Sequence, residues 1–291
     1  MREPTRVQID RVSDLTPDRF RAEYQAIGRP VVIEHAGDAW IDLWTPATVK
    51  EAFGDREIPV ESRDGGLADR RALIPVRVDE FVDAVESDNC TLTLRGTASG
   101  LFHYLPEMLQ AFLDDDCFYP YSLHHSTVEN LSLWMQPEGN LSYLHIDNTN
   151  DNLHTIVQGH KKFILAPPSN FKDYYHYGWR ASEVNAFAPD LEKYPRFADV
   201  TLFEATLGPG DMIYIPGYWW HSVHAETVCI SVNKWYPPSM SVIAQIKQTP
   251  VPDKAMMLAM HYLYQGKTGQ YLAKAYDLIR PREKSAPPTA V

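Results

Sequence analysis

Residues 203–216, Phe-Glu-Ala-Thr-Leu-Gly-Pro-Gly-Asp-Met-Ile-Tyr-Ile-Pro, contain two short apolar runs on either side of a sharp turn. Each run has the length of a strand and is too short for a stable helix. The turn between them consists of Gly-Pro-Gly-Asp, and glycine and proline at such positions interrupt regular structure. This stretch therefore predicts two consecutive strands joined by a tight connection.

The same alternation of short strands and turns extends over residues 130–237. Residues 131–135 alternate between apolar and polar side chains, and residues 228–233 form a last alternating strand. Between them, residues 153–165 contain two apolar runs that meet at Gln158-Gly159-His160, a pattern typical of a tight hairpin. Because no long helical pattern interrupts this region, we expect an antiparallel barrel or sandwich.

The flanking segments have a mixed or helical character. Thr16-Pro17, Thr45-Pro46 and Asp79 mark the expected starts of three helices, which alternate with short apolar strands in residues 1–130. After residue 238 the pattern becomes helical up to residue 280, and residues 281–291 are expected to form a flexible tail. The predicted fold is thus mainly β with helical flanks, in which residues 1–238 form one domain around a barrel core at about 131–238.

Composition restricts the classes of function. The chain has 291 residues, 44% of them hydrophobic, and a formal net charge of −11, which argues against a general nucleic-acid binder. No apolar run is long enough to span a membrane, and no signal peptide is expected. Three widely spaced cysteines, Cys90, Cys117 and Cys229, are interpreted as reduced thiols of a cytoplasmic protein.

Two histidines and one carboxylate form a candidate metal site. His145 and Asp147 are two residues apart, so in a strand they project from the same face, and His221 follows 74 residues after Asp147. Two imidazoles and a carboxylate leave half of an octahedron open, which suits a non-haem Fe(II). A lone His-x-Asp triplet is weak evidence, since about one is expected by chance in such a chain. The alternative is that both histidines are ordinary barrel residues satisfied by hydrogen bonds.

The order of several motifs makes the pattern specific. Residues 131–238 resemble the JmjC-type, cupin-8 branch of Fe(II)/2-oxoglutarate oxygenases, and in particular the subgroup of asparaginyl hydroxylases. The motifs that carry the resemblance are Leu144-His145-Ile146-Asp147, Asp151-Asn152-Leu153, Gln158-Gly159-His160-Lys161, Leu165-Ala166-Pro167-Pro168, Gly208-Pro209-Gly210-Asp211, Ile215-Pro216, Trp219-Trp220-His221 and Ser231-Val232-Asn233-Lys234-Trp235.

The resemblance implies a double-stranded β-helix, the jelly-roll barrel of the cupins, and a set of ligands. It implies that His145, Asp147 and His221 hold Fe(II), and that 2-oxoglutarate chelates this metal, with O2 as the second cosubstrate. The distal carboxylate of 2-oxoglutarate would meet Lys161, which lies at the family's lysine position, while Lys162 is expected to face solvent.

Three further polar residues match family positions near the cosubstrate. Ser142 corresponds to a hydroxyl that the family uses on the distal carboxylate, and Asn152 and Asn233 correspond to polar positions near the metal. Each of the three is alternatively a buried side chain bonded to the backbone.

The chain also departs from the family pattern. His154 stands where relatives usually carry an apolar or aromatic residue: it is favoured as a hydrogen-bonded histidine of the barrel wall, and the alternatives are that it lines the pocket, contacts substrate or adds a ligand. A cosubstrate-binding tyrosine of the family has no clear match, and Thr93 falls near its place. Asn148-Thr149-Asn150 lengthens the loop after Asp147, and the cluster of Tyr174, Tyr175, Tyr177, Trp179 and Arg180 is either a substrate groove or a packed loop.

The sequence thus predicts a 2-oxoglutarate-dependent dioxygenase that hydroxylates a peptide, a protein side chain or a small molecule and releases succinate and CO2. Desaturation, cleavage or cyclisation at the same site, and a non-catalytic scaffold that keeps the barrel, remain as alternatives. The apolar residues Met256, Met257, Leu258, Met260, Tyr262, Leu263 and Tyr264 lead us to expect a homodimer through the C-terminal helices.

Overall fold

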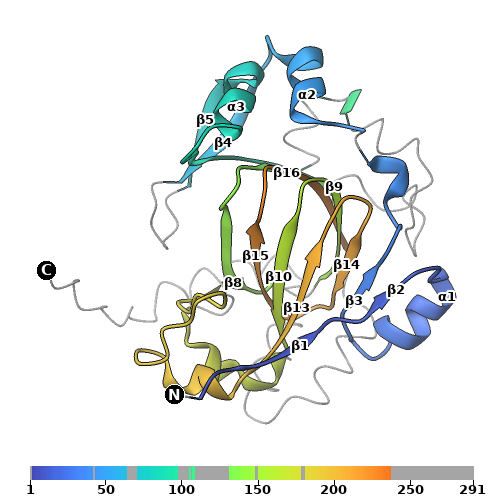
Figure 1. Cartoon of the computed structure of the whole chain (residues 1–291), viewed down its shortest axis with the longest axis vertical. Helices are drawn as coiled ribbons and strands as arrows, with labels where there is room; N and C mark the ends of the chain where they lie inside the picture. The colour runs from blue at the N-terminus through green and yellow to red at the C-terminus, as the bar shows by residue number, and fades with distance from the viewer. Residues whose placement is uncertain are drawn as a thin grey trace, which may run out of the picture.

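The computed structural model describes residues 2–41, 43–63, 71–97, 105, 107–108, 131–147, 150–177 and 181–236. Its strands form two sheets, of seven and nine strands, that face each other in the middle of the molecule (Figure 1). The mainly β fold expected from the sequence is confirmed.

Four strands of each sheet form the barrel. In the seven-stranded sheet they are β13 (Thr201–Leu207), β10 (Lys161–Ala166), β15 (Trp220–Ala225) and β8 (Leu141–His145), in that order. In the nine-stranded sheet they are β14 (Met212–Ile215), β9 (Asp151–Gln158), β16 (Cys229–Tyr236) and β7 (Leu131–Gln136). All neighbours within these two sets are antiparallel, as in a jelly-roll. The expected turns lie where the sequence placed them, because β9 and β10 meet at Gly159 and β13 and β14 at Gly208–Asp211.

The barrel interior is filled by side chains that alternate along the strands. One buried apolar cluster joins the two sheets and contains Ile156, Phe163, Leu165, Ala205, Leu207, Ile213, Ile215 and Trp219. Residues between these positions point outward, as the period of two in a strand requires, and some of them, such as Ile164 and Tyr214, are buried by elements that pack on the barrel.

Short strands extend both sheets at their edges. The seven-stranded sheet continues through β1 (Thr5–Gln8), parallel to β13, and through β12 (Ala181–Ser182) and β11 (His176–Tyr177) beyond β8. The nine-stranded sheet continues through β3 (Val31–Ile33) and β2 (Arg11–Val12) on one side, and through β6 (Leu92–Thr97), β4 (Glu57–Arg63) and β5 (Arg71–Arg77) on the other. Sequence reasoning missed β5, whose Pro75 is tolerated because β5 is an edge strand.

Helices form where the capping signals predicted them. α1 (Pro17–Phe20) continues into a π-helical turn (Arg21–Gln25), and α2 (Pro46–Phe53) begins at a capping box made by Thr45 and Thr48. α3 (Val78–Val85) starts one residue before Asp79, so the expectation that Asp79 caps this helix is wrong: Arg77 is the N-cap, and the Asp79 carboxylate accepts from the Glu80 amide. In the described part of the chain, 3-10 turns lie at Asp38–Trp40, Pro168–Tyr174 and Pro195–Asp199.

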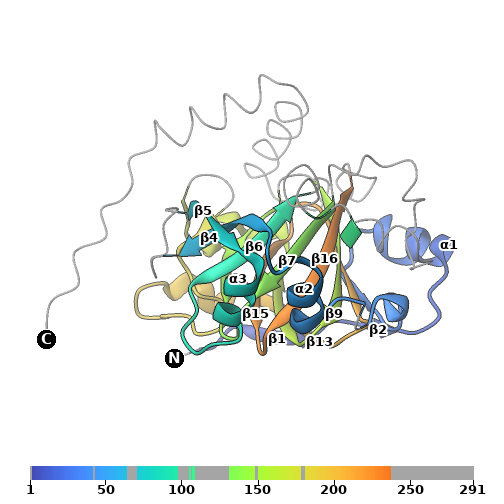
Figure 2. The ribbon, with the colours of Figure 1, turned by 90° about the horizontal axis from the view of Figure 1, so that it is seen from above.

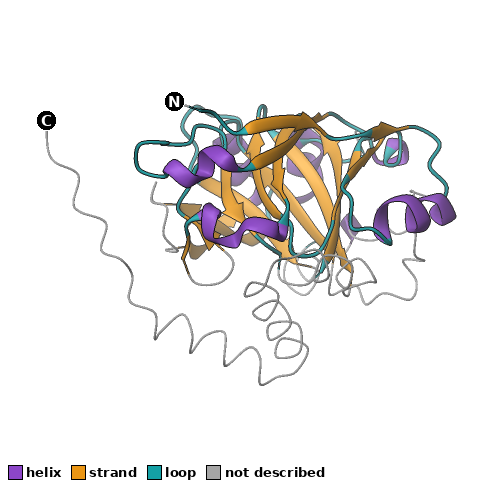
Figure 3. Ribbon diagram, turned by 90° about the horizontal axis from the view of Figure 1, so that it is seen from below, coloured by secondary structure: helices purple, strands orange, loops and turns teal. Residues whose placement is uncertain are grey.

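The helices pack on the outside of the barrel (Figures 2 and 3). α2 and α3 cover one end of the nine-stranded sheet through a cluster that includes Phe53, Phe81, Leu133 and Val232. The two 3-10 turns at 168–174 and 195–199 cover the outer face of the seven-stranded sheet. Several polar side chains, among them Asn152, Lys161 and Asn233, are buried within the barrel, so its interior is the place to look for chemistry.

Among the residues that the structure describes, no helix is long and apolar enough to cross a membrane. The helices expected in residues 239–280, the tail at 281–291 and Cys117 lie outside the described residues.

Candidate metal centre

The end of β8 and the start of β15 bring the predicted triad together. His145 is the last residue of β8 and lies directly opposite His221 on β15, with ring centroids 4.3 Å apart. Asp147 follows β8 and places its carboxylate 3.7 Å from His145 Nε2 and 3.4 Å from His221 Nε2. Ile146, which lies between His145 and Asp147 in the sequence, is buried in the apolar cluster on the outer face of the seven-stranded sheet, as the alternation predicted. One ligand atom from each residue lies within 4.8 Å of the others.

Backbone carbonyls orient both imidazoles. His145 Nδ1 lies 2.6 Å from the carbonyl oxygen of Tyr143, and His221 Nδ1 lies 3.2 Å from that of Trp219. A carbonyl oxygen only accepts, so each Nδ1 carries the proton and donates it. Each Nε2 therefore presents a lone pair toward Asp147, which is the tautomer that binds a metal.

Hydrogen bonds fix the carboxylate as well. Asp147 Oδ2 accepts from Asn152 Nδ2 at 2.9 Å and from Trp235 Nε1 at 2.8 Å. Asn152 in turn accepts from Asn233 at 3.2 Å, and Asn233 accepts from Trp134 Nε1 at 2.7 Å. The two predicted asparagines thus hold Asp147 through side chains, and the alternative of backbone bonding is not what the structure shows.

Sequence reasoning gave neither Trp235 nor Trp134 a role in holding the carboxylate. A signal for both was present, because Ser231, Asn233 and Trp235 alternate on the inner face of β16 and Trp134 lies opposite Ser231. An indole N–H on that face needs an acceptor when it is buried, and the triad carboxylate supplies one.

The carboxyl and the imidazoles of the triad shift one another's pKa values. Burial opposes ionisation of Asp147, but the neighbouring His221 and His145 outweigh it and hold the pKa of this carboxyl below its ordinary value. Burial likewise opposes protonation of His221, while the Asp147 carboxylate raises its pKa overall. The three residues together favour a cation between them.

Ser142 reaches the barrel interior because β8 is irregular. Val223 pairs with Ser142 and His221 pairs with His145, so an advance of three residues along β8 matches an advance of two residues along β15. This bulge places Ser142 and His145 on the same inward face, although they are three residues apart. The Ser142 carbonyl oxygen accepts from Ser222 Oγ at 2.7 Å, which fixes the bulged backbone.

Lys161 is a buried cation inside the barrel. Its side chain is 1% exposed, and its ammonium donates to Ser231 Oγ at 2.7 Å. Burial lowers the pKa of Lys161 to about 8. Lys162 points outward to Glu204 at 3.4 Å, so the expected division of the two lysines is confirmed. A buried ammonium beside one neutral hydroxyl is poorly compensated, and an acidic ligand would compensate it.

The structure also gives the positions of His224, Tyr174 and Thr93. His224 faces outward and contacts Phe187, with ring centroids 5.6 Å apart. Tyr174 is fully buried against Trp220 and donates to the Pro167 carbonyl oxygen, so for this residue the packed-loop interpretation is correct. Thr93 is buried on β6 opposite Glu61.

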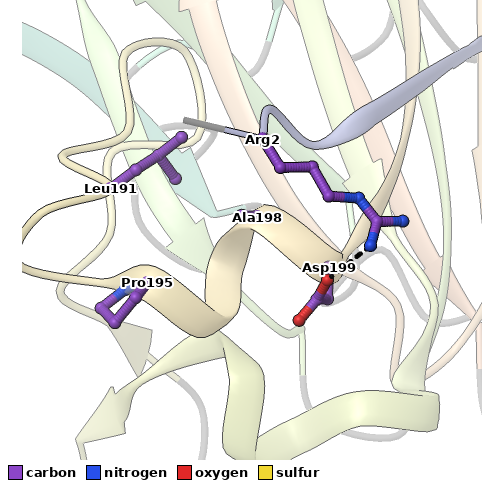
Figure 4. A pocket seen from close by; sticks show the side chains of 5 residues that line it. All are labelled: Arg2, Leu191, Pro195, Ala198 and Asp199. Carbon is purple, nitrogen blue, oxygen red and sulfur yellow. Dashed lines mark hydrogen bonds and ion pairs between the residues drawn. The ribbon is translucent and has the colours of Figure 1, made fainter.

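A surface hollow lies away from these residues. It is lined by Arg2, Leu191, Pro195, Ala198 and Asp199, with Arg2 and Asp199 paired across it at 3.2 Å (Figure 4). None of its residues belongs to the triad or contacts Lys161, and the Arg2 and Asp199 side chains are largely exposed. The barrel interior remains the candidate site.

Comparisons with known proteins agree with this site. The Cupin-like domain family, Cupin_8, matches residues 17–241. The chain is 27% identical over 228 residues to lysine-specific demethylase 8 of Xenopus tropicalis, a match that covers 75% of this chain and 50% of the relative. It is 24% identical over 260 residues to the bifunctional peptidase and (3S)-lysyl hydroxylase JMJD7 of Homo sapiens, covering 76% and 81%. It is also 29% identical over 257 residues to the HSPB1-associated protein 1 homolog of Danio rerio, covering 80% and 57%.

Proposed function

Because the chain belongs to the Cupin_8 family of cupin-like domains, we propose that it is an Fe(II)- and 2-oxoglutarate-dependent dioxygenase. It hydroxylates a C–H bond of its substrate and releases succinate and CO2. The observation that carries the proposal is the convergence of two imidazole Nε2 atoms and one carboxylate, each held by its own hydrogen bonds. Since the chain spans only half of the Xenopus relative, activity is proposed for this chain rather than transferred.

The donor set fits Fe(II). In the proposal His145, Asp147 and His221 would hold the metal, and three protein ligands would leave coordination positions for the cosubstrate and O2. Lys161 and Ser142 receive the distal carboxylate of 2-oxoglutarate, while Asn152 and Asn233 keep Asp147 oriented. When bound, the metal and its cosubstrate supply the oxidising power, through oxidative decarboxylation of 2-oxoglutarate by O2.

The protein contributes orientation and exclusion of water. The apolar side chains of the inner cluster surround the cosubstrate position and keep it dry, which strengthens the bond between Lys161 and a carboxylate. The triad is closed on one side and open on the other: the His221 side chain is 4% exposed, whereas that of His145 is 35% exposed. Substrate therefore approaches from the His145 side.

The proposed substrate class is a side chain of a peptide or protein. Two relatives carry names that refer to lysine, a demethylase and a lysyl hydroxylase, which supports this class over a small metabolite. Hydroxylation and other oxidative outcomes use the same iron site and differ in how the substrate C–H bond is held. The intact triad and the buried lysine favour an enzyme over a non-catalytic scaffold.

We extend the proposal to the organisation of the chain. Residues 1–238 form the catalytic domain, and residues 239–280 pair two chains into a homodimer. A cytoplasmic location is supported by Cys90 and Cys229, which are both free thiols.

An anaerobic titration tests the cosubstrate directly. Fe(II) and 2-oxoglutarate together are expected to give the visible charge-transfer band of a chelated 2-oxo acid, and His145→Ala is expected to abolish it. Lysine-containing peptides can then be screened by succinate release and by the mass of the product. Iron binding without the band would reject 2-oxoglutarate as the cosubstrate, and binding of neither would favour a scaffold.

A further inference from the structure

Cross-strand pairing orders the inward side chains of the seven-stranded sheet into layers. From the triad toward Lys161, the layers of cross-strand partners are Leu165–His221–His145, then Phe163–Val223–Ser142, then Lys161–Ala225. The triad and Lys161 thus lie two layers apart, with the layer of Ser142 between them. Alternate residues of a strand are roughly 7 Å apart, so a five-carbon dicarboxylate extends from the metal into this middle layer, where the Lys161 ammonium reaches it.

His154 occupies the middle layer from the opposite sheet. It lies on β9, directly opposite Asn233 of β16 and Ile213 of β14, two residues that face the interior. Its ring meets Phe163 across the barrel in an edge-to-face contact, with centroids 5.3 Å apart. His154 therefore faces the space between the metal ligands and Lys161.

The ring of His154 is buried without a hydrogen bond. The residue is 7% exposed, and within the described part of the chain its fully buried Nε2 has no partner. An unmet imidazole nitrogen in an apolar interior is costly, which indicates that a ligand completes it. Burial first, and then the Lys161 ammonium, hold the pKa of His154 well below its ordinary value, so the ring is neutral and has one N–H to donate.

We propose that His154 is a specificity-determining residue that donates a hydrogen bond to the distal carboxylate of the bound 2-oxo dicarboxylate, across from Ser142 and beside Lys161. This inference rests on the proposed cosubstrate. A neutral donor suits this position, because it can share a carboxylate with the ammonium of Lys161 without repelling it. A fourth metal ligand is a different role, and among the residues that the structure describes, the ligand atoms that converge within 4.8 Å are those of the triad.

Binding measurements with two ligands test the proposal. We would titrate the Mn(II)-loaded protein by calorimetry with 2-oxoglutarate and with 2-oxobutyrate, which chelates the metal in the same way but lacks the distal carboxylate. His154→Phe is expected to weaken 2-oxoglutarate binding about 10- to 100-fold, the usual effect of losing a hydrogen bond to a charged group, and to leave 2-oxobutyrate binding unchanged. His154→Gln, which keeps an N–H donor, is expected to recover part of the loss.

Each other outcome has a definite meaning. Wild-type affinity for 2-oxoglutarate in His154→Phe would overturn the proposal and make His154 a wall residue. An equal loss for both ligands would also overturn it, in favour of a packing role, and Phe163→Leu provides the matched control for loosened packing in the same layer. Weaker Mn(II) binding alone would identify a metal ligand. If the wild-type protein binds Mn(II) but not 2-oxoglutarate, the cosubstrate itself is wrong, which is distinguishable from a failure at His154.

Discussion

Asp147 is the metal-binding residue of the triad whose carboxylate two side-chain donors hold. Its Oδ2 receives one bond from an amide and one from an indole, and both donors come from the nine-stranded sheet. The two histidines lie on the seven-stranded sheet, so the carboxylate is held from one side of the barrel while its metal partners are held from the other. Positioning bonds of this kind tune metal affinity even though their donors never touch the metal.

Removing either donor is expected to weaken metal binding. Asn152→Ala and Trp235→Phe should each lower the affinity for Fe(II) or Mn(II) roughly 10- to 100-fold, measured by anaerobic calorimetry, because Asp147 loses its fixed orientation. Trp134→Phe is the matched control, since its indole acts one step further away through Asn233. An equal loss in Trp134→Phe would show that general packing of the barrel matters more than these bonds.

The pKa of Lys161 gives the site a pH dependence. Burial lowers this pKa to about 8 in the free protein, so the ammonium is present below that pH and is lost above it. Binding of a carboxylate requires the charged form, and the affinity for 2-oxoglutarate should therefore fall about tenfold per pH unit above pH 8. The Lys161→Met variant should bind 2-oxoglutarate weakly, and its affinity should not fall in this way above pH 8. A titration with Mn(II) alone is the control, because it measures how metal binding by the triad depends on pH. A flat affinity across this range in the wild-type protein would contradict the assignment of Lys161.

At the scale of elements, the β9–β10 hairpin decides whether Lys161 enters the barrel. Gly159 at its turn has φ +79°, and a Cβ added there would lie 2.2 Å from the Val228 carbonyl oxygen and 2.8 Å from Cys229 Sγ. Both the backbone conformation and the close approach therefore exclude other residues. Gly139, in the turn between β7 and β8, has φ +75° but open space around it.

These two glycines form a matched pair for a stability measurement. Gly139→Ala is expected to lower the free energy of unfolding by about 1 kcal/mol, the cost of the left-handed conformation alone. Gly159→Ala should cost at least about 3 kcal/mol, because a clash with backbone adds to that strain. Urea unfolding monitored by tryptophan fluorescence would compare them, and equal losses would mean that the strand ends separate to admit the methyl group.

The sequence predicted the strands of the barrel and brought out the three residues of the triad, but it missed the edge strand β5 and the details that depend on register. Alternation along strands predicted that Lys161 faces inward and Lys162 outward, and pairing confirmed it. Period-two reasoning applied to β8 would have placed Ser142 on the opposite face from His145, since only the bulge brings them together. A bulge is set by the partner strand, which lies about 80 residues away, so no local pattern reports it. The bond from Trp235 to Asp147 likewise depends on two strands from different sheets.

At the scale of the whole molecule, the proposal has two parts: a dioxygenase site inside the barrel, and the association of two chains into a homodimer. The triad, Lys161 and His154 all lie in one chain, within the described ranges 131–147, 150–177 and 181–236. Residues 255–264 lie outside the described part, and their sequence contains seven large apolar or aromatic side chains and two alanines among ten residues. In the proposed homodimer, the apolar side chains that one surface cannot bury are covered by the same segment of the second chain.

Light scattering at micromolar concentration is therefore expected to give the mass of two chains of 33.2 kDa each. Leu258→Asp and Leu263→Asp should shift the protein to a single chain, because a charge buried in an apolar interface strongly opposes association. The affinities for Mn(II) and 2-oxoglutarate should remain within about twofold of the wild type, since these residues are distant in sequence from the barrel site. A wild-type protein of single-chain mass would reject the dimer and leave the site proposal intact. Loss of cosubstrate binding in the monomeric variants would instead show that the second chain helps to shape the barrel.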